Sequence, residues 1–278
     1  MAAVLTELVV ATYENPHALA LCLTSAALLA PAPDSIAIAD DGSGPETAAV
    51  VDAFRARSPV PLRHVWHEDR GFQKNAILNR AIASSEADFL VFIDGDVLLR
   101  PDFLGHHLAL ARPDRWSSGS LIRLDAAATA AVTADLIASG RVFARDWLRE
   151  HRAIDRFGTW LKTRPLPQPL LKTLDAVTPV QKAWGGANSS AFRAALVAVN
   201  GFDEAMKYGG EDKELGVRLT NNGVRGQHLR YVASVVHLDH GRGYVDRALI
   251  AANKARIREA RRLGASWTSD GIVKRAAP

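Results

Sequence analysis

Five consecutive apolar residues, 89–93, run directly into two carboxylates that a single glycine separates, Asp94-Gly95-Asp96. A run this short and this apolar is typical of a central strand that is buried on both faces. In α/β proteins, ligands bind outside the carboxyl ends of such strands. Two acids at that position repel each other and are costly to desolvate unless a cation neutralises them. The segment therefore predicts a divalent-metal site that receives a phosphorylated ligand.

The residues before this segment alternate between apolar runs and helical stretches. We predict strands over 5–11, 35–39, 62–66 and 89–93, and helices over 17–30, 47–58 and 73–84. This order predicts an α/β fold with a mostly parallel sheet and helices on its faces. Each strand ends in polar or acidic residues on the same edge, where we expect a nucleotide. No G-x-G-x-x-G or G-x-x-x-x-G-K-[ST] motif is present to favour a dinucleotide or P-loop site.

The second half of the chain is less regular. Residues 147–184 contain several prolines and predict a functional loop region. After this region we predict a helix that ends near residue 199, a helix over 211–221 and a last strand over 231–236.

The composition indicates a folded protein in a reducing compartment. Hydrophobic residues make up 48% of the chain and charged residues 23%, which is not a disordered composition. The single cysteine, Cys22, has no partner for an internal disulfide. We see neither a signal peptide nor a run of about 18 apolar residues that predicts a membrane span. We therefore expect a cytoplasmic protein.

Basic residues are concentrated between Arg247 and Arg262, and the net formal charge of the chain is +4. The simpler interpretation is a helix with a solvated charged face. The alternative is attraction to an anionic lipid surface or to a polyanionic acceptor. Aromatic residues make up only 7% of the chain and no nucleic-acid-binding motif occurs, so we expect no nucleic-acid partner.

Two more pairs of chemically active residues lie in the second half. Glu211 and Asp212 follow a Gly-Gly pair and begin a predicted helix, where acids either cap the helix or serve an acceptor site. In the acceptor site, one carboxylate would accept a hydroxyl proton and the other would bind the acceptor. His237 and His240 follow the last strand. Each is either a structural histidine or a ligand that, beside two aspartates, favours Mn²⁺ over Ca²⁺, and the spacing does not decide which one binds.

Several short motifs occur in an order that is specific as a set. They span residues 9–14, 40–43, 68–79, 92–96, 186–188, 201–204 and 209–212. Over residues 4–245 this order resembles the family 2 glycosyltransferases of GT-A fold, and is similar to bacterial polysaccharide synthases with a galactosyltransferase-like C-terminal domain. The resemblance implies a Rossmann-like, mostly parallel central sheet flanked by helices, and a less regular acceptor-binding C-terminal half.

The resemblance also implies roles for individual residues. The donor would contact Thr12, Tyr13, Glu14, Asp40, Asp41, Glu68, Gly71, Phe72, Lys74, Asn79, Asp94 and Gly95. Mn²⁺ or Mg²⁺ would be held by Asp96 with His237, or with His240 as the second choice. Asp212 would be the catalytic base, with Glu211 beside it at the acceptor. The cleft for the sugar and the acceptor would be lined by Trp184, Gly185, Gly186 and Asn188. Tyr208 replaces a tryptophan that is common in relatives, which leaves the acceptor open.

The implied activity is a metal-dependent, inverting transfer of a sugar from a nucleotide-diphosphate donor, UDP-hexose or UDP-N-acetylhexosamine, to a sugar hydroxyl. The acceptor would be a glycan or a lipid-linked glycan in surface polysaccharide or glycolipid synthesis. A lipid-linked acceptor would bring the enzyme to the inner face of the cell membrane. The donor sugar and base, the acceptor, the linkage and the oligomeric state stay open.

One continuous GT-A domain would then have three parts. Residues 1–115 would bind the nucleotide sugar, residues 116–245 would bind the acceptor and supply the base, and residues 246–278 would form a basic helix and tail. Two other functions stay in view. A sugar-phosphate nucleotidyltransferase would need a glycine-rich basic loop after the first strand, which is absent, and a non-catalytic nucleotide-sugar or glycan-binding module would not need Glu211 and Asp212.

Overall fold

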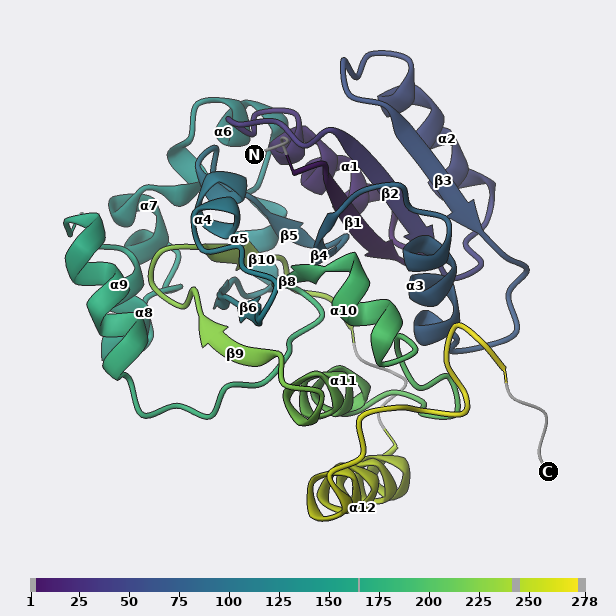
Figure 1. The fold of residues 1–278 in the computed structure, drawn as a ribbon. Coiled ribbons are helices and arrows are strands. Elements are labelled where there is room, and N and C mark those ends of the chain that lie inside the picture. Colours follow the sequence, from purple (N-terminus) through teal and green to yellow (C-terminus); the bar gives the residue numbers. More distant parts are fainter. Residues whose placement is uncertain (1–3, 165, 242–245, 275–278) are drawn as a thin grey trace.

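The computed structural model describes residues 4–164, 166–241 and 246–274. Within these ranges a seven-stranded sheet runs through the centre of the molecule, with helices on both faces (Figure 1). Its strand order is β3-β2-β1-β4-β8-β6-β9. The strands are β1 (Thr6–Thr12), β2 (Ser35–Asp40), β3 (Leu62–Trp66), β4 (Phe89–Asp94), β6 (Arg115–Ser118), β8 (Ser189–Phe192) and β9 (Arg225–His228). The predicted α/β class with a mostly parallel sheet is confirmed.

The strands of the first half are parallel and lie where the sequence predicts them. They alternate with three helices, α1 (Pro16–Ala26), α2 (Pro45–Arg55) and α3 (Lys74–Ala83). Successive residues of β1 face opposite sides of the sheet. Leu8 and Val10 pack in one apolar cluster with side chains of α1 and α2, and Val9 and Ala11 pack in another with side chains of α3. Burial on both faces explains why these strands are nearly continuous apolar runs.

Several helices differ from the sequence predictions. α1 ends at Ala26 rather than near residue 30, because the next residues close into tight turns. α9 (Gln168–Val177) forms inside the region 147–184, for which we predicted a loop. Pro167 and Pro169 lie at its start, where a missing backbone N–H costs no helical hydrogen bond. These prolines therefore mark the beginning of a helix.

The second half adds strands in both directions and a small second sheet. β8 is antiparallel to both β4 and β6, and β9 is parallel to β6. The last predicted strand is displaced, because regular pairing begins only at Ser234. That strand is β10 (Ser234–His237), which lies between β5 (Val97–Leu98) and β7 (Ser120–Arg123) in the small sheet. The small sheet brings His237 beside Arg123 and Val97.

Short helices cover the second half. They are α4 (Phe103–Ala109), α5 (Ala126–Ala130), α6 (Ala134–Ala138), η1 (Arg141–Phe143), α7 (Arg145–Glu150), α8 (Phe157–Lys162) and α10 (Arg193–Ala198). Two longer helices, α11 (Glu211–Asn221) and α12 (Arg247–Leu263), follow. None of the helices in the described ranges combines the length and the apolar character needed to cross a membrane.

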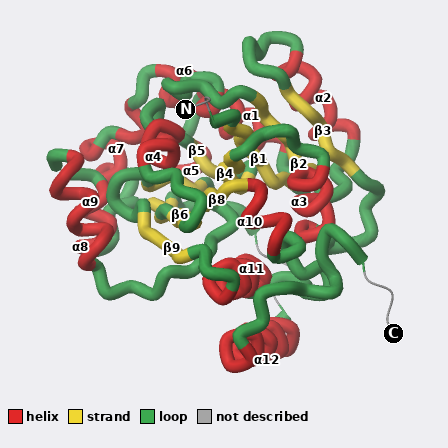
Figure 2. The backbone as a smooth tube through the Cα atoms, viewed as in Figure 1, coloured by secondary structure: helices red, strands yellow, loops and turns green. Residues whose placement is uncertain are grey.

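α12 packs beside α11, and the loop after α12 runs back toward α3 and α10 (Figure 2). The buried residues of α12 are Asn253, Ile257 and Ala260, whereas its basic residues are largely exposed. This agrees with the simpler interpretation of the basic stretch as a solvated helix face. Residues 275–278, the end of the predicted helix and tail over 246–278, lie outside the described residues, as do residues 1–3, 165 and 242–245.

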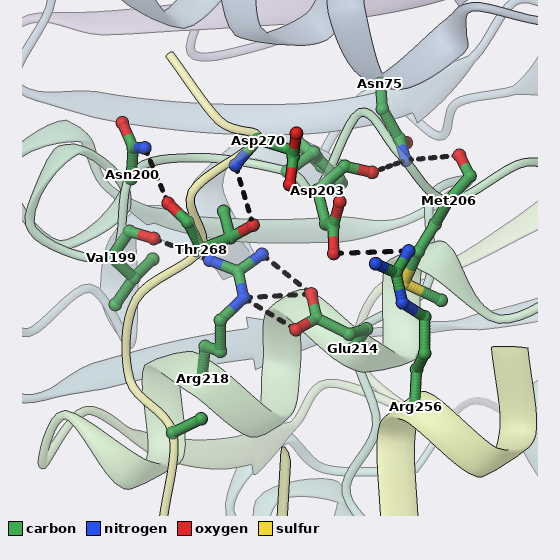
Figure 3. A network of polar contacts seen from close by, with 12 residues as sticks. Asn75, Val199, Asn200, Asp203, Met206, Glu214, Arg218, Arg256, Thr268 and Asp270 are labelled. Atoms are coloured by element: carbon green, nitrogen blue, oxygen red, sulfur yellow. Dashed lines mark hydrogen bonds and ion pairs between the residues drawn. The ribbon is translucent and has the colours of Figure 1, made fainter. Parts of the chain in front are cut away.

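A buried polar network fixes α11 against its neighbours (Figure 3). Arg218 is 1% exposed, and its guanidinium donates to both carboxylate oxygens of Glu214 at 2.7–2.9 Å and to the carbonyl of Val199 at 2.6 Å. From α3, the Asn75 amide donates to the carbonyls of Asp203 and Met206. Further contacts bring in α12 and the C-terminal residues through Asn200, Arg256, Thr268 and Asp270. The first turn of α11, which contains Glu211 and Asp212, is therefore held rigidly in place.

Candidate active site

A cavity of about 850 Å³ opens at the carboxyl ends of β1 and β4. Thr12 and Asp94, the last residues of these strands, are among the residues that line it. Gly95 allows the turn after β4 to lie against β1: its N–H donates to the Ala11 carbonyl at 2.7 Å, and a Cβ would come within 3.2 Å of Thr12. Residues from both halves of the chain line the remaining walls.

Lys74 lies at the centre of the cavity between carboxylates of the two halves. Its Nζ donates to Asp94 Oδ1 at 2.6 Å. A Cβ on Gly186 would be 2.9 Å from this nitrogen and 2.8 Å from Asp212 Oδ2, so a larger residue would displace the lysine, the aspartate or both. Burial alone would lower the pKa of Lys74, but Asp94, Asp212 and Glu211 outweigh it and raise the pKa. The lysine is therefore a permanent cation in an acidic site.

Asp212 is the carboxyl group whose surroundings best fit a proton acceptor. Burial raises its pKa to about 7; Lys74 opposes the increase, whereas Glu211 and Asp94 add to it. Its Oδ2 accepts from the Gly186 N–H at 3.0 Å, while Oδ1 has no hydrogen-bond partner among the described residues. A carboxyl that lines a cavity, has a pKa near neutrality and has one oxygen without a partner has the properties of a general base.

Glu211 lies beside Asp212 but makes different contacts. Its Oε2 accepts from the N–H groups of Gly209 and Gly210, both at 2.7 Å. The carboxylate thus holds the glycine turn at the start of α11, which matches the helix-capping alternative. It also lines the cavity and adds negative charge beside Asp212.

Asp96, His237 and His240 meet at one end of the cavity. One ligand atom from each lies within 4.8 Å of the others. Asp96 Oδ2 is 3.2 Å from His240 Nε2, and Oδ1 is 3.7 Å from His237 Nε2. Asp96 Oδ1 is buried and has no hydrogen-bond partner among the described residues. Burial and Asp94 raise the pKa of Asp96 despite both histidines, and burial lowers the pKa of His237. Burial is the largest cause of both shifts, so each group is harder to charge here than in water.

The loop residues at the opposite end form a polar wall. Asp41 is held by His67 Nε2 at 2.8 Å and by the Gln73 N–H at 3.0 Å, and burial raises its pKa despite these contacts. The Tyr13 hydroxyl donates to Asp69, and the Glu14 carboxylate accepts from the Gly44 N–H. The predicted residues that line the cavity here are Thr12, Tyr13, Glu14, Asp41, Gly71 and Phe72.

On the other side of the cavity, Gly185, Gly186 and Asn188 line the wall as predicted from the sequence. Asn188 is 3% exposed, and its amide is already engaged: Nδ2 donates to the Ala233 carbonyl at 2.6 Å, and Oδ1 contacts His107. Its side chain therefore holds β10 and α4 in position.

Four predicted donor-site or cleft residues do not line the cavity. The Asp40 carboxylate faces the opposite side of β2 and binds His64 Nε2 and the Ser43 N–H. Glu68 is solvent-exposed and pairs with Arg70. Asn79 is buried and exchanges hydrogen bonds with the backbone of Phe202. Trp184 is 1% exposed and packs against Phe92 and Trp116 in the core.

The sequence analysis missed part of the lining. The cavity also contains Asn15, Ser118, Gly119, Leu121, Arg123 and Tyr208. Arg123 ends β7, a strand of four residues with no clear alternation, so no sequence pattern marks its side chain as facing a site. Tyr208 immediately precedes the Gly-Gly-Glu-Asp motif and was noted only as a departure from relatives.

Comparisons of the sequence find two family models in chain order. Residues 7–118 match the model for glycosyl transferase family 2, and residues 171–241 match the model described as the N-terminal domain of galactosyltransferase. Validoxylamine A glucosyltransferase from Streptomyces hygroscopicus subsp. limoneus is 26% identical over 231 residues, which cover 79% of this chain and 49% of the relative. The chain thus spans about half the length of this curated relative.

Comparisons of the structure identify glycosyltransferases of the same fold. A mannosyltransferase from Pyrobaculum calidifontis, in complex with GDP-Man and Mn²⁺, has a TM-score of 0.60 at 18% identity, covering 88% of this chain and 59% of that chain. Glucosyl-3-phosphoglycerate synthase from Mycobacterium tuberculosis, in complex with Mg²⁺ and UDP, has a TM-score of 0.53 at 14% identity, covering 96% and 81%. These similarities show the GT-A fold.

Proposed function

We propose that this chain is a family 2 glycosyltransferase of GT-A fold, in agreement with the family model that matches residues 7–118. We propose further that it moves a hexose or N-acetylhexosamine from a UDP-linked donor to a sugar hydroxyl. The observation that supports this proposal best is the convergence of Lys74, Asp94, Asp96 and Asp212 on one cavity at the carboxyl ends of the parallel strands. Similar proteins are named as glucosyl- and mannosyltransferases and are described with UDP or GDP-Man.

In this proposal the nucleoside lies against the polar wall formed by Thr12, Tyr13, Glu14 and Asp41. The diphosphate lies toward Asp94 and Asp96, where the turn at Gly95 brings the backbone close. Lys74 neutralises Asp94 and Asp212 in the donor-free site. The donor sugar then lies between Lys74 and the Gly185-Gly186 wall.

The residues at the diphosphate end fit a divalent metal. One carboxylate oxygen and two imidazole nitrogens are grouped closely, and the buried oxygen of Asp96 has no partner among the described residues. Nitrogen and oxygen ligands together suit Mn²⁺, and Mg²⁺ is the alternative. His237 and His240 would hold the ion with Asp96. When bound, the metal neutralises charge that develops on the departing diphosphate.

Asp212 carries the proton chemistry. Its ionised carboxylate accepts the proton of the acceptor hydroxyl as that oxygen bonds to the anomeric carbon. The bond between the anomeric carbon and the diphosphate oxygen breaks on the opposite face, so the anomeric configuration inverts. A pKa of about 7 keeps a large share of Asp212 ionised at neutral pH while leaving it basic enough to accept a proton.

A donor-hydrolysis screen tests the proposal without knowledge of the acceptor. UDP-, GDP- and dTDP-sugars are incubated with the protein and Mn²⁺ or Mg²⁺, with and without excess EDTA. We expect release of UDP that EDTA abolishes. Hydrolysis that persists in EDTA would contradict the metal's role, and consumption of a nucleoside triphosphate instead would favour nucleotidyl transfer.

Once an acceptor is found, Asp212→Asn should reduce kcat by at least about a hundredfold, as loss of a general base does. UDP affinity should change little. Asp114→Asn, an equivalent substitution at an exposed aspartate that pairs with Arg112, is the matched control and should retain activity. Normal turnover by the Asp212→Asn protein would disprove the assignment of the base.

A further inference from the structure

Three cations gather around β7 at one side of the cavity: Arg123, Lys162 and Arg230, which we call the basic cluster. Arg123 ends β7 and lines the cavity. Lys162, from α8, is 7% exposed, and its Nζ donates to the carbonyl of Leu121, another lining residue, at 2.7 Å. The carbonyl of Arg230 accepts from the Ser120 hydroxyl at 2.5 Å, which places this arginine at the start of the same strand.

The basic cluster lacks counterions. Among the described residues, none of its three cations forms an ion pair with a carboxylate, and the buried Nε of Arg230 has no hydrogen-bond partner. Burial, together with Arg230, Arg156 and Arg123, lowers the pKa of Lys162 to about 8, and Asp155 opposes this shift only in part. Asp155 is itself engaged with Arg156 and with the Thr159 hydroxyl. Positive charge therefore exceeds negative charge around these three residues.

The rest of the cavity has the opposite charge. Asp94, Asp96, Glu211 and Asp212 line its centre, and Lys74 is the cation among them. A neutral sugar acceptor would gain little from an unpaired basic cluster, whose mutual repulsion opposes folding. An anionic group would relieve that repulsion and form charge-assisted hydrogen bonds with an arginine.

We propose that Arg123 binds a phosphate group carried by the acceptor, while Lys162 and Arg230 behind it keep this side of the cavity positive. The proposal rests on the proposed function, because it assumes that the cavity takes a donor and an acceptor together. The phosphate belongs either to a soluble phosphorylated sugar or to a lipid headgroup. Arg123 also pairs in register with His237, so the competing role is contact with the donor diphosphate.

The test measures phosphate binding with the donor site filled. Glucose 6-phosphate and glucose are titrated by calorimetry into the full chain in the presence of saturating UDP and Mn²⁺. Arg123→Gln is the main variant. Because Arg123 is exposed, we expect the variant protein to fold normally. Arg258→Gln, which removes an exposed arginine from α12, is the control. Lys162→Gln and Arg230→Gln test the supporting charges.

We expect glucose 6-phosphate to bind at least about tenfold more tightly than glucose, and Arg123→Gln to remove that difference. The control should match the wild type, the supporting variants should lose affinity by a few-fold, and UDP affinity should be unchanged in all. Equal binding of the two sugars overturns the proposal unless the vesicle arm described next shows phosphate-dependent binding. An Arg123→Gln protein that loses UDP and glucose 6-phosphate affinity equally also overturns it, since the cluster would then serve the donor.

A parallel arm identifies the source of the phosphate. Phosphatidylcholine vesicles with and without phosphatidylglycerol are sedimented with the same variants. If the protein binds only the anionic vesicles and the Arg123→Gln protein does not, the phosphate belongs to a lipid. If the protein binds glucose 6-phosphate tightly but no vesicles, the phosphate belongs to a soluble sugar. If it binds neither, the proposal is overturned. Donor hydrolysis is measured on the same preparation. If the donor is hydrolysed but no phosphate compound binds, this inference is refuted and the proposed function is not. If the donor is not hydrolysed, the proposed function is refuted. In that case glucose 6-phosphate is titrated again without UDP.

Discussion

Replacing Lys74 by glutamine should move the pH dependence of catalysis, because this lysine stabilises the ionised form of Asp212. A Cβ atom added to Gly186 would lie 2.9 Å from Lys74 Nζ and 2.8 Å from Asp212 Oδ2. Their separation therefore has an upper limit of about 6 Å. At that distance and an effective dielectric constant of about 20, two unit charges interact by about 3 kcal/mol.

That energy sets the size of the expected shift. One pKa unit corresponds to about 1.4 kcal/mol, so loss of the lysine charge should raise the pKa of Asp212 by about two units from its value near 7. A base works in its ionised form, so kcat/KM rises with pH through this pKa. In the Lys74→Gln protein the rise should occur about two pH units above that of the wild type, at about pH 9.

The assay is a pH profile of kcat/KM between about pH 5 and 10 at saturating metal, since this quantity reports the free enzyme. Activity of the Lys74→Gln protein at pH 7 should fall roughly tenfold or more and recover at high pH. Lys74→Arg keeps the positive charge, so the rise of kcat/KM with pH should occur at the same pH as in the wild type. A Lys74→Gln protein that loses the same fraction of activity at every pH would refute the reasoning, since the lysine would then act only through donor binding.

Three further predictions follow from the same contacts. His237→Ala should weaken Mn²⁺ binding, followed by electron paramagnetic resonance, by at least about tenfold; unchanged affinity would exclude His237 as a ligand. Gly186→Ala should lower kcat roughly a hundredfold by displacing the base, whereas Gly185→Ala, whose Cβ would meet nothing nearer than 3.7 Å, should not; equal effects would contradict a steric cause. Arg218→Met should cost about 3–5 kcal/mol in urea unfolding by leaving Glu214 buried and unpaired, and adding Glu214→Leu should restore most of it; no recovery would show that packing, not charge, is lost.

The parallel half of the fold was predictable because its strands carry their own signal. β1, β2 and β4 are apolar on both faces, and turns with glycine, proline or acids separate them from helices. β8 lacks such a signal. Ser189 and Ser190 are fully buried there, and their hydroxyls contact the Gly185 N–H and His107. A strand stabilised by specific hydrogen bonds rather than by apolar burial looks like a loop in sequence, so its antiparallel pairing with β4 became visible only in the structure.

For the candidate site, the sequence likewise predicts which residues are present but not how they pack. The sequence identifies acids at strand ends, but it does not say which way each side chain points. Asp40 and Asp41 are neighbours, and adjacent residues at a strand end face opposite sides; Asp41 lines the cavity and Asp40 binds His64 behind it. In α3, Lys74 faces the cavity while Asn75 and Asn79 face the backbone of the second half. These assignments depend on which partner packs against each face.

Contacts between the two halves, rather than either half alone, complete the site. The predicted division after residue 115 falls inside β6, and the sheet continues across it through the pairing of β4 with β8. Lys74 and Asp96 come from the first half, whereas Asp212 and His237 come from the second. The proposed base therefore owes its charge balance to a lysine of the first half, and the proposed metal site needs a histidine of the second half. A change in the position of α11 relative to β4 would alter the acidity of Asp212 even if no cavity residue were replaced.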